Sequence, residues 1–343
     1  MNSPSIFANC SKHYDIEPVF EQCTNATNPC KSISDIETAI VIIWVDYYSS
    51  TALFAIAILI NIYCLILTCT IFRRMQEDSK KKYVFLISRC SSSTVSAISW
   101  LLIQCIYIRF LPPIPDNYPY YVIALTLYDA SIYGMLGSYV GMSLVLYIGV
   151  IFPATFHQRV RLRFLYGSVN VICVVSFALS IPLAVYQAAI AIPGTLGCTD
   201  NSCAPMVTMI NFVLVTGSLL ITISILLFVL YSINRHRKEM KKTETLSNSS
   251  LKSGFRLLSW TFCAIILVTI AEVTPFAMSA TRKQGNWDDN PSCHSFELSP
   301  NVILEACLST VESVIWAVAL IIDPLANIIF DRTVSRQAMN QVE

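Results

Sequence analysis

Long apolar runs separated by short polar segments are the dominant pattern of this chain. Seven runs reach the roughly 20 residues that a helix needs to cross a bilayer. They fall at about 51–72, 83–108, 120–152, 165–192, 206–231, 257–280 and 302–330. In lipid, backbone groups must be hydrogen-bonded within the segment, and no alternating barrel pattern is present. The pattern therefore predicts an all-α membrane protein with a seven-transmembrane helix bundle.

Composition agrees with a membrane protein and argues against other classes. The chain is 55% hydrophobic and 13% charged, with a mean hydropathy of +0.58, whereas soluble domains are about 45–50% apolar and 25% charged. A net charge of +1 without a dense basic stripe predicts no nucleic acid partner. The four histidines are scattered, and no paired nucleophile and base is apparent. We expect no metal, no cofactor and no enzymatic activity.

The charges between the runs predict the orientation. Seventeen of the 23 Lys and Arg residues follow runs one, three, five and seven. By the positive-inside rule, the N-terminus is outside and the C-terminus is cytoplasmic. This divides the chain into an extracellular tail at 1–48, the transmembrane domain at 49–330 and a cytoplasmic tail at 331–343. The patch Ala39–Val45, cut off by Asp46, is interpreted as an interfacial segment, and the region from Asn234 to Arg256 as a solvated loop.

The outer tail carries two glycosylation sequons, at Asn9 and Asn25. Six cysteines fall in the predicted outer segments, an even number that permits disulfides in an oxidising compartment. These candidates are Cys10, Cys23, Cys30, Cys198, Cys203 and Cys293. Sequence leaves their connectivity open.

Acidic residues in the outer half of the bundle predict a ligand pocket. Asp129, Glu272 and Glu312 lie at related depths, with Tyr128 and Asn211 as further candidates. Ionisable groups in a bilayer are costly, so each requires a role. Together they would favour a polar or cationic small molecule, although they could instead bond to hydroxyls between helices. A transporter or ion channel using these acids is the alternative, but acids gathered toward one side fit a pocket better than a path.

Two opposite charges lie toward the cytoplasmic side. Arg89 in the second run and Asp323 in the seventh have comparable depths, so a contact would offset the cost of burying each. The alternative is that Arg89 extends to water on its own. Asn61 is a neutral companion, and Pro275 and Pro324 are predicted hinges because proline removes a helical hydrogen bond.

Several motifs resemble those of rhodopsin-like G-protein-coupled receptors. AILINIYCLIL contains the first-helix asparagine, Asn61; AEVTPFAM contains the sixth-helix proline, Pro275; and IIDPLANIIF contains the seventh-helix Asp-Pro motif. The segment YIGVIFP resembles the end of the third helix, but Val145-Leu146-Tyr147 keeps only the tyrosine of the usual charged triplet. Leu146 stands where the arginine is expected.

With YVFLISRC at the start of the second helix and a basic third inner loop, the chain looks like a member of the nematode serpentine chemoreceptor superfamily, with class xa as the suggested subclass. The resemblance implies a chemosensory receptor in the plasma membrane of a sensory cilium, coupling a small environmental molecule to a heterotrimeric G protein. The candidate G-protein contacts, which could equally attract anionic lipid, are Tyr147, Arg159, Arg161, Arg163, Arg235, Arg237, Lys238, Lys241 and Lys242.

Overall fold

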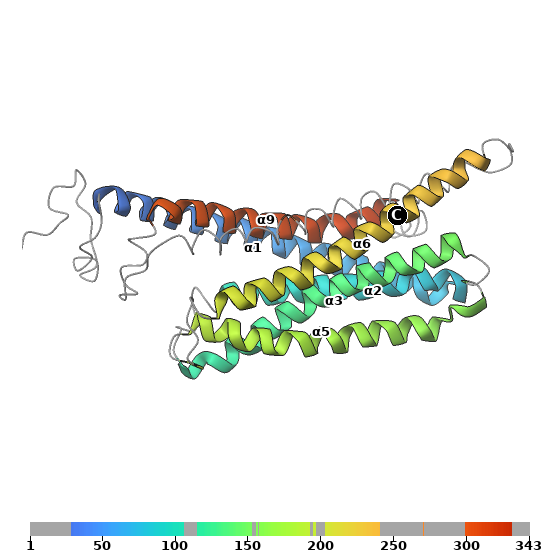
Figure 1. The fold of residues 1–343 in the computed structure, drawn as a ribbon, viewed down its shortest axis with the longest axis horizontal. Helices are drawn as coiled ribbons and strands as arrows, with labels where there is room; N and C mark the ends of the chain where they lie inside the picture. Colours follow the sequence, from blue (N-terminus) through green and yellow to red (C-terminus); the bar gives the residue numbers. More distant parts are fainter. Residues whose placement is uncertain are drawn as a thin grey trace, which may run out of the picture.

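The computed structural model describes residues 29–105, 115–152, 156, 158–192, 195–196, 203–240, 270 and 299–330, and these residues form six long helices. The helices are α1 (Pro29–Arg74), α2 (Glu77–Cys105), α3 (Tyr118–Ile151, preceded by the 3₁₀ turn η3 at Pro115–Asn117), α5 (Leu162–Ala191), α6 (Ala204–Met240) and α9 (Ser299–Phe330). No strand occurs among these residues. Each helix is long and apolar enough to cross a membrane, so the protein is an all-helical, multi-pass membrane bundle (Figure 1).

Six of the predicted runs are thereby confirmed as helices. The run at 257–280, which holds Glu272 and Pro275, lies outside the described residues except for Ile270. The seventh span and the orientation of the termini therefore stay predictions.

The first helix begins much earlier than expected. Residues Ala39–Val45 belong to one continuous helix that starts at Pro29 and includes the first apolar run, and their interfacial position stays a prediction. Asp46 does not interrupt it, because its side chain is buried against α9, where the Ser313 hydroxyl donates to Oδ2 at 3.5 Å. The part of the predicted outer tail from Pro29 onward is thus helical.

The α6 helix runs on past the expected end of its apolar run. It reaches Met240, whereas a solvated loop was expected from Asn234. The added residues include Arg, Lys, Glu and Met, which are among the better helix formers. Figure 1 shows this end of α6 extending beyond its neighbours.

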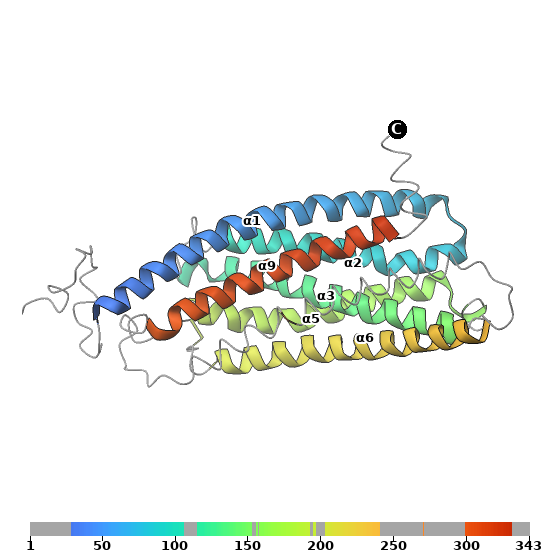
Figure 2. The ribbon, with the colours of Figure 1, turned by 90° about the horizontal axis from the view of Figure 1, so that it is seen from above.

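The α3 helix is the central element of the bundle. It packs against α2, α5 and α6, while α2 also packs against α1, and α1 lies along α9 (Figures 1 and 2). The largest buried cluster, which we call the main core, lies between these helices and includes the stacked rings of Phe54 and Trp100, whose centroids are 4.1 Å apart. Apolar faces at helical spacing therefore meet along the whole bundle.

Two glycines allow α3 to approach its neighbours closely. A Cβ atom at Gly137 would lie 2.5 Å from Ile172 Cγ2 on α5, and one at Gly141 would lie 2.3 Å from Phe85 Cε1 on α2. Small residues serve this purpose in membrane bundles, where close packing drives helix association. These contacts fix α3 beside α2, the helix that carries Arg89.

Candidate functional site

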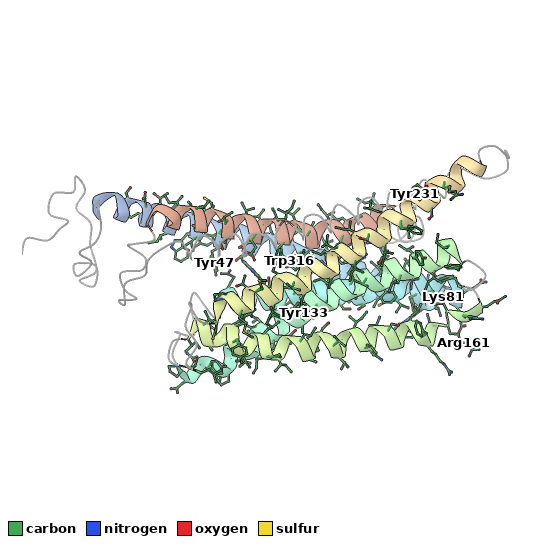
Figure 3. The ribbon with its side chains drawn as sticks, viewed as in Figure 1. Tyr47, Lys81, Tyr133, Arg161, Tyr231 and Trp316 are labelled. Carbon is green, nitrogen blue, oxygen red and sulfur yellow. The ribbon has the colours of Figure 1, made fainter. Side chains whose placement is uncertain are left out.

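A buried ion pair joins α2 to α9. Arg89 Nε lies 2.7 Å from Asp323 Oδ2, and the two side chains are 0% and 4% exposed. The contact expected from the sequence is present, and the alternative in which Arg89 extends to water is wrong because its side chain is fully buried. Both residues lie toward what we call the basic end of the bundle, the end that carries Arg74, Lys81 and Arg161 (Figure 3).

The same arginine is held from α3. Its Nη1 donates to Met142 Sδ at 3.2 Å, and its guanidinium carbon lies 4.6 Å from the centre of the Tyr139 ring. A guanidinium over an aromatic face is a favourable cation–π arrangement. Arg89 therefore contacts α3 and α9 at once.

The pair lies in the interior of the bundle, where both side chains are almost completely buried. Burying two charges costs several kcal/mol for each ion, and only excellent geometry with further hydrogen bonds repays that cost. The pair is thus a weak source of stability.

Asn61 supports α9 next to this pair. Pro324 has no N–H, so the carbonyl of Leu320, four residues earlier, lacks its normal helical donor. Asn61 Nδ2 donates to that carbonyl at 2.9 Å from α1, and it also donates to Ala57 O at 2.8 Å. An interhelical hydrogen bond thus replaces the backbone bond that the proline removes, directly beside Asp323.

Two thiols complete the contact between α1 and α2 at this level. Cys64 and Cys90 are buried, and their Sγ atoms are 3.7 Å apart. Both behave as small apolar groups that let the helices approach. They place Asn61 and Arg89 on adjoining faces of the two helices.

The predicted pocket residues are distributed over three helices. Asp129 on α3 is buried, Glu312 on α9 is half-buried, and Tyr128 is half-buried against the main core. Asn211 on α6 accepts a hydrogen bond from the Tyr133 hydroxyl, which ties α6 to α3. Glu272 lies outside the described residues. Asp129 and Asn211 belong to the half of the bundle opposite the basic end.

At the basic end, the foot of α3 makes apolar contacts. Leu146 and Tyr147 pack against the main core, and the Tyr147 and Phe228 rings have centroids 5.7 Å apart. The position expected to hold a charged arginine, Leu146, therefore packs against apolar residues, and the neighbouring Tyr147 contacts α6. Charge appears instead on α2 and α9.

The basic residues at this end differ in exposure. The side chains of Arg159, Arg161, Arg163 and Arg235 are exposed. Lys81 is buried, with Nζ 5.0 Å from the centre of the Phe156 ring and donating to Phe156 O at 3.5 Å. Lys81 therefore holds the segment after α3 in place. Arg237 and Lys238 lie in α6 with side chains that are not described, and Lys241 and Lys242 lie outside the described residues.

The candidate modification sites fall mostly outside the described residues. This applies to Asn9, Asn25, Cys10, Cys23, Cys198 and Cys293. Cys30 lies in the first turn of α1. Cys203, one of the six predicted cysteines, is disulfide-bonded, and the connectivity stays a prediction.

The fold and the buried charges define a multi-pass helical membrane protein. Comparison with known proteins places it more closely. It is 55% identical over 340 residues to the Caenorhabditis elegans "Putative G-protein coupled receptor-like protein B0244.6", covering 99% of this chain and 90% of that protein. It is 31% identical over 330 residues to "Putative G-protein coupled receptor B0244.5" from the same organism, covering 95% and 89%.

A third relative, the C. elegans "Putative G-protein coupled receptor B0244.4", is 34% identical over 274 residues, covering 79% of this chain and 87% of that protein. No family model matches the chain. The chain belongs to this nematode family of serpentine, G-protein-coupled-receptor-like proteins. The relatives are named as receptors, not as enzymes.

Proposed function

We propose that this protein is a chemosensory G-protein-coupled receptor. It binds a small environmental molecule in an outward-facing pocket of the plasma membrane, with its N-terminus outside, and it signals to a heterotrimeric G protein. The observation that carries the proposal is the buried Arg89–Asp323 pair, which connects two helices of the bundle beside Pro324. Receptors need an element with two alternative arrangements that a ligand can bias, and a buried ion pair beside a proline suits that purpose.

The ligand side of the proposal rests on the acidic residues. Asp129 is buried at 3% exposure in the half of the bundle away from the basic end, and Glu272 and Glu312 complete the set, with Tyr128 and Asn211 as polar neighbours. A pocket with fixed negative charge favours a ligand with an amine or another cationic group. The sequons and the disulfides belong to the same outer face.

The signalling side rests on the basic end. Arg159, Arg161, Arg163 and Arg235 have exposed side chains there, and Tyr147 occupies the foot of α3. Pro324 is one hinge, and Pro275 is the second. Changes of α9 at its hinge would alter the surface that these basic side chains present to the G protein.

A compound screen with two readouts tests the proposal. Cells expressing the full chain are screened with volatile and soluble compounds, including amines, and active compounds are then tested for nucleotide exchange by purified G protein. The same compounds are tested for flux in liposomes that contain the protein. We expect exchange that Asp129→Asn weakens and that Val174→Ala, at an exposed position of α5, leaves unchanged. Compound-dependent flux with no exchange would overturn the receptor in favour of a transporter or channel.

A further inference from the structure

We propose that the Arg89–Asp323 pair is the ionic lock of the resting bundle, and that its separation is the step that releases α9 toward the active arrangement. The lock connects α9 to α2 directly and to α3 through Tyr139 and Met142. Its role in signalling rests on the proposed receptor function, whereas its role in holding the helices together can be measured without a G protein.

Burial makes the lock a two-state element. The side chains are 0% and 4% exposed, so neither charge reaches water while the helices stay in place. Opposite charges attract strongly in such a site, but each is poorly tolerated alone because it has lost its hydration. A small separation is therefore unfavourable. The stable alternatives are a closed pair and an arrangement in which α9 has moved far enough for water or new partners to reach both charges.

The backbone of α9 is weak at the position of the lock. Pro324 follows Asp323 directly, and the Leu320 carbonyl is bonded to Asn61 on α1 instead of to a helical N–H. The helical bond to the Leu320 carbonyl is thus already absent, so bending at this point does not have to break it. Motion of the end of α9 from Asp323 onward, about two turns, would separate Asp323 from Arg89 while the earlier part of the helix keeps its packing against α1.

The foot of α3 offers no substitute for the lock. Leu146 and Tyr147 make apolar contacts, including the one between the rings of Tyr147 and Phe228. Apolar contacts are non-directional, and they tolerate sliding better than a buried ion pair does. The charged element that discriminates between two arrangements is therefore the one between α2 and α9.

The experiment removes both charges together, so that no unpaired charge stays buried. The full chain with Arg89→Met and Asp323→Asn is compared with wild type in lipid nanodiscs. Spin labels on encoded keto amino acids at Ile329 and Phe164, which are 59% and 67% exposed, report the distance from the end of α9 to the start of α5. The matched control is Ser88→Ala with Ser138→Ala, which removes a neutral 2.8 Å contact between α2 and α3 beside the lock.

We expect the double charge variant to show a second distance population, together with a basal nucleotide exchange rate raised about 5- to 150-fold, the usual range of coupling between sites. The serine control should match wild type in both measurements. A new distance population without any exchange supports the lock and counts against G-protein coupling. If the folded double variant has the same distance distribution as wild type, the lock is overturned. This conclusion holds even if the basal exchange rate of the variant rises, or if a compound still stimulates nucleotide exchange through the wild-type protein.

A second variant keeps the test informative if the double variant does not fold. Arg89→Lys keeps the charge but lacks the planar guanidinium that lies over Tyr139 and reaches Met142. It should show the same second distance population at a lower level than the double variant would. A wild-type distance distribution in Arg89→Lys under those conditions overturns the proposal.

Discussion

Removing one charge of the Arg89–Asp323 pair should destabilise the protein far more than removing both. At the 2.7 Å separation of Nε and Oδ2, and with an effective dielectric constant of about 20, the Coulomb attraction is about 6 kcal/mol. Burying each ion costs several kcal/mol, so the net contribution of the intact pair is close to zero. Arg89→Met or Asp323→Asn alone leaves one buried charge without its partner, and each should lower the free energy of unfolding by about 3–5 kcal/mol.

The double variant should unfold within about 1 kcal/mol of wild type, because both desolvation costs disappear together with the attraction. The purified full chain is titrated with a denaturing detergent in mixed micelles and followed by tryptophan fluorescence. The four proteins form a double-mutant cycle, with Ser88→Ala and Ser138→Ala as a neutral cycle at the same level of α2 and α3. Losses that simply add, with a coupling energy below about 0.5 kcal/mol, would show that the two charges do not depend on each other.

Three further predictions concern neighbouring contacts. Gly141→Ala should lower the free energy of unfolding by about 1–3 kcal/mol, because its Cβ would collide with the Phe85 ring. Gly217→Ala, which has open space around it, should raise the free energy of unfolding by about 0.3–1 kcal/mol. The same detergent titration compares the two variants. Asn61→Leu should lower the free energy of unfolding by about 1–3 kcal/mol, because the Leu320 carbonyl loses its hydrogen-bond donor. Amide hydrogen exchange at the end of α9 should become faster. Leu146→Arg should destabilise by about 1–3 kcal/mol without raising nucleotide exchange, since its site is an apolar contact; increased exchange would show that the missing triplet arginine can still be used.

The sequence predicts the ion pair for a physical reason. Charged side chains are rare in membrane helices because each is costly there, so two opposite charges at comparable depth are strong candidates for a contact. The same logic did not extend to Tyr139 and Met142, which contact Arg89 from α3. An aromatic ring and a thioether in an apolar run are indistinguishable from ordinary core residues. Their contribution depends on which face of α3 meets α2, and only the packed structure shows this.

The extent of α1 was missed for a related reason. An aspartate normally marks the edge of an apolar run, so Asp46 predicted a helix that starts after it. In the structure, Asp46 is buried against Ser313 of α9, 267 residues away in the chain. Partners so distant in sequence leave no local signal. The buried Lys81 is a comparable case, because a lysine in a basic segment suggests solvent exposure, whereas its ammonium group lies over the Phe156 ring.

The geometry of α3 gives the proposed pocket a direct route to the proposed lock. Met142 follows Asp129 by 13 residues, which is about 20 Å along a helix at about 1.5 Å per residue. Between them, the buried Tyr133, Met135 and Tyr139 belong to the main core, so this part of α3 is packed against several helices. A ligand charge that draws Asp129 by a fraction of an ångström would therefore shift Tyr139 and Met142 against the guanidinium of Arg89. Because that guanidinium is shared between α3 and α9, a displacement of α3 alters its contact with Asp323 without any contact between the ligand and α9.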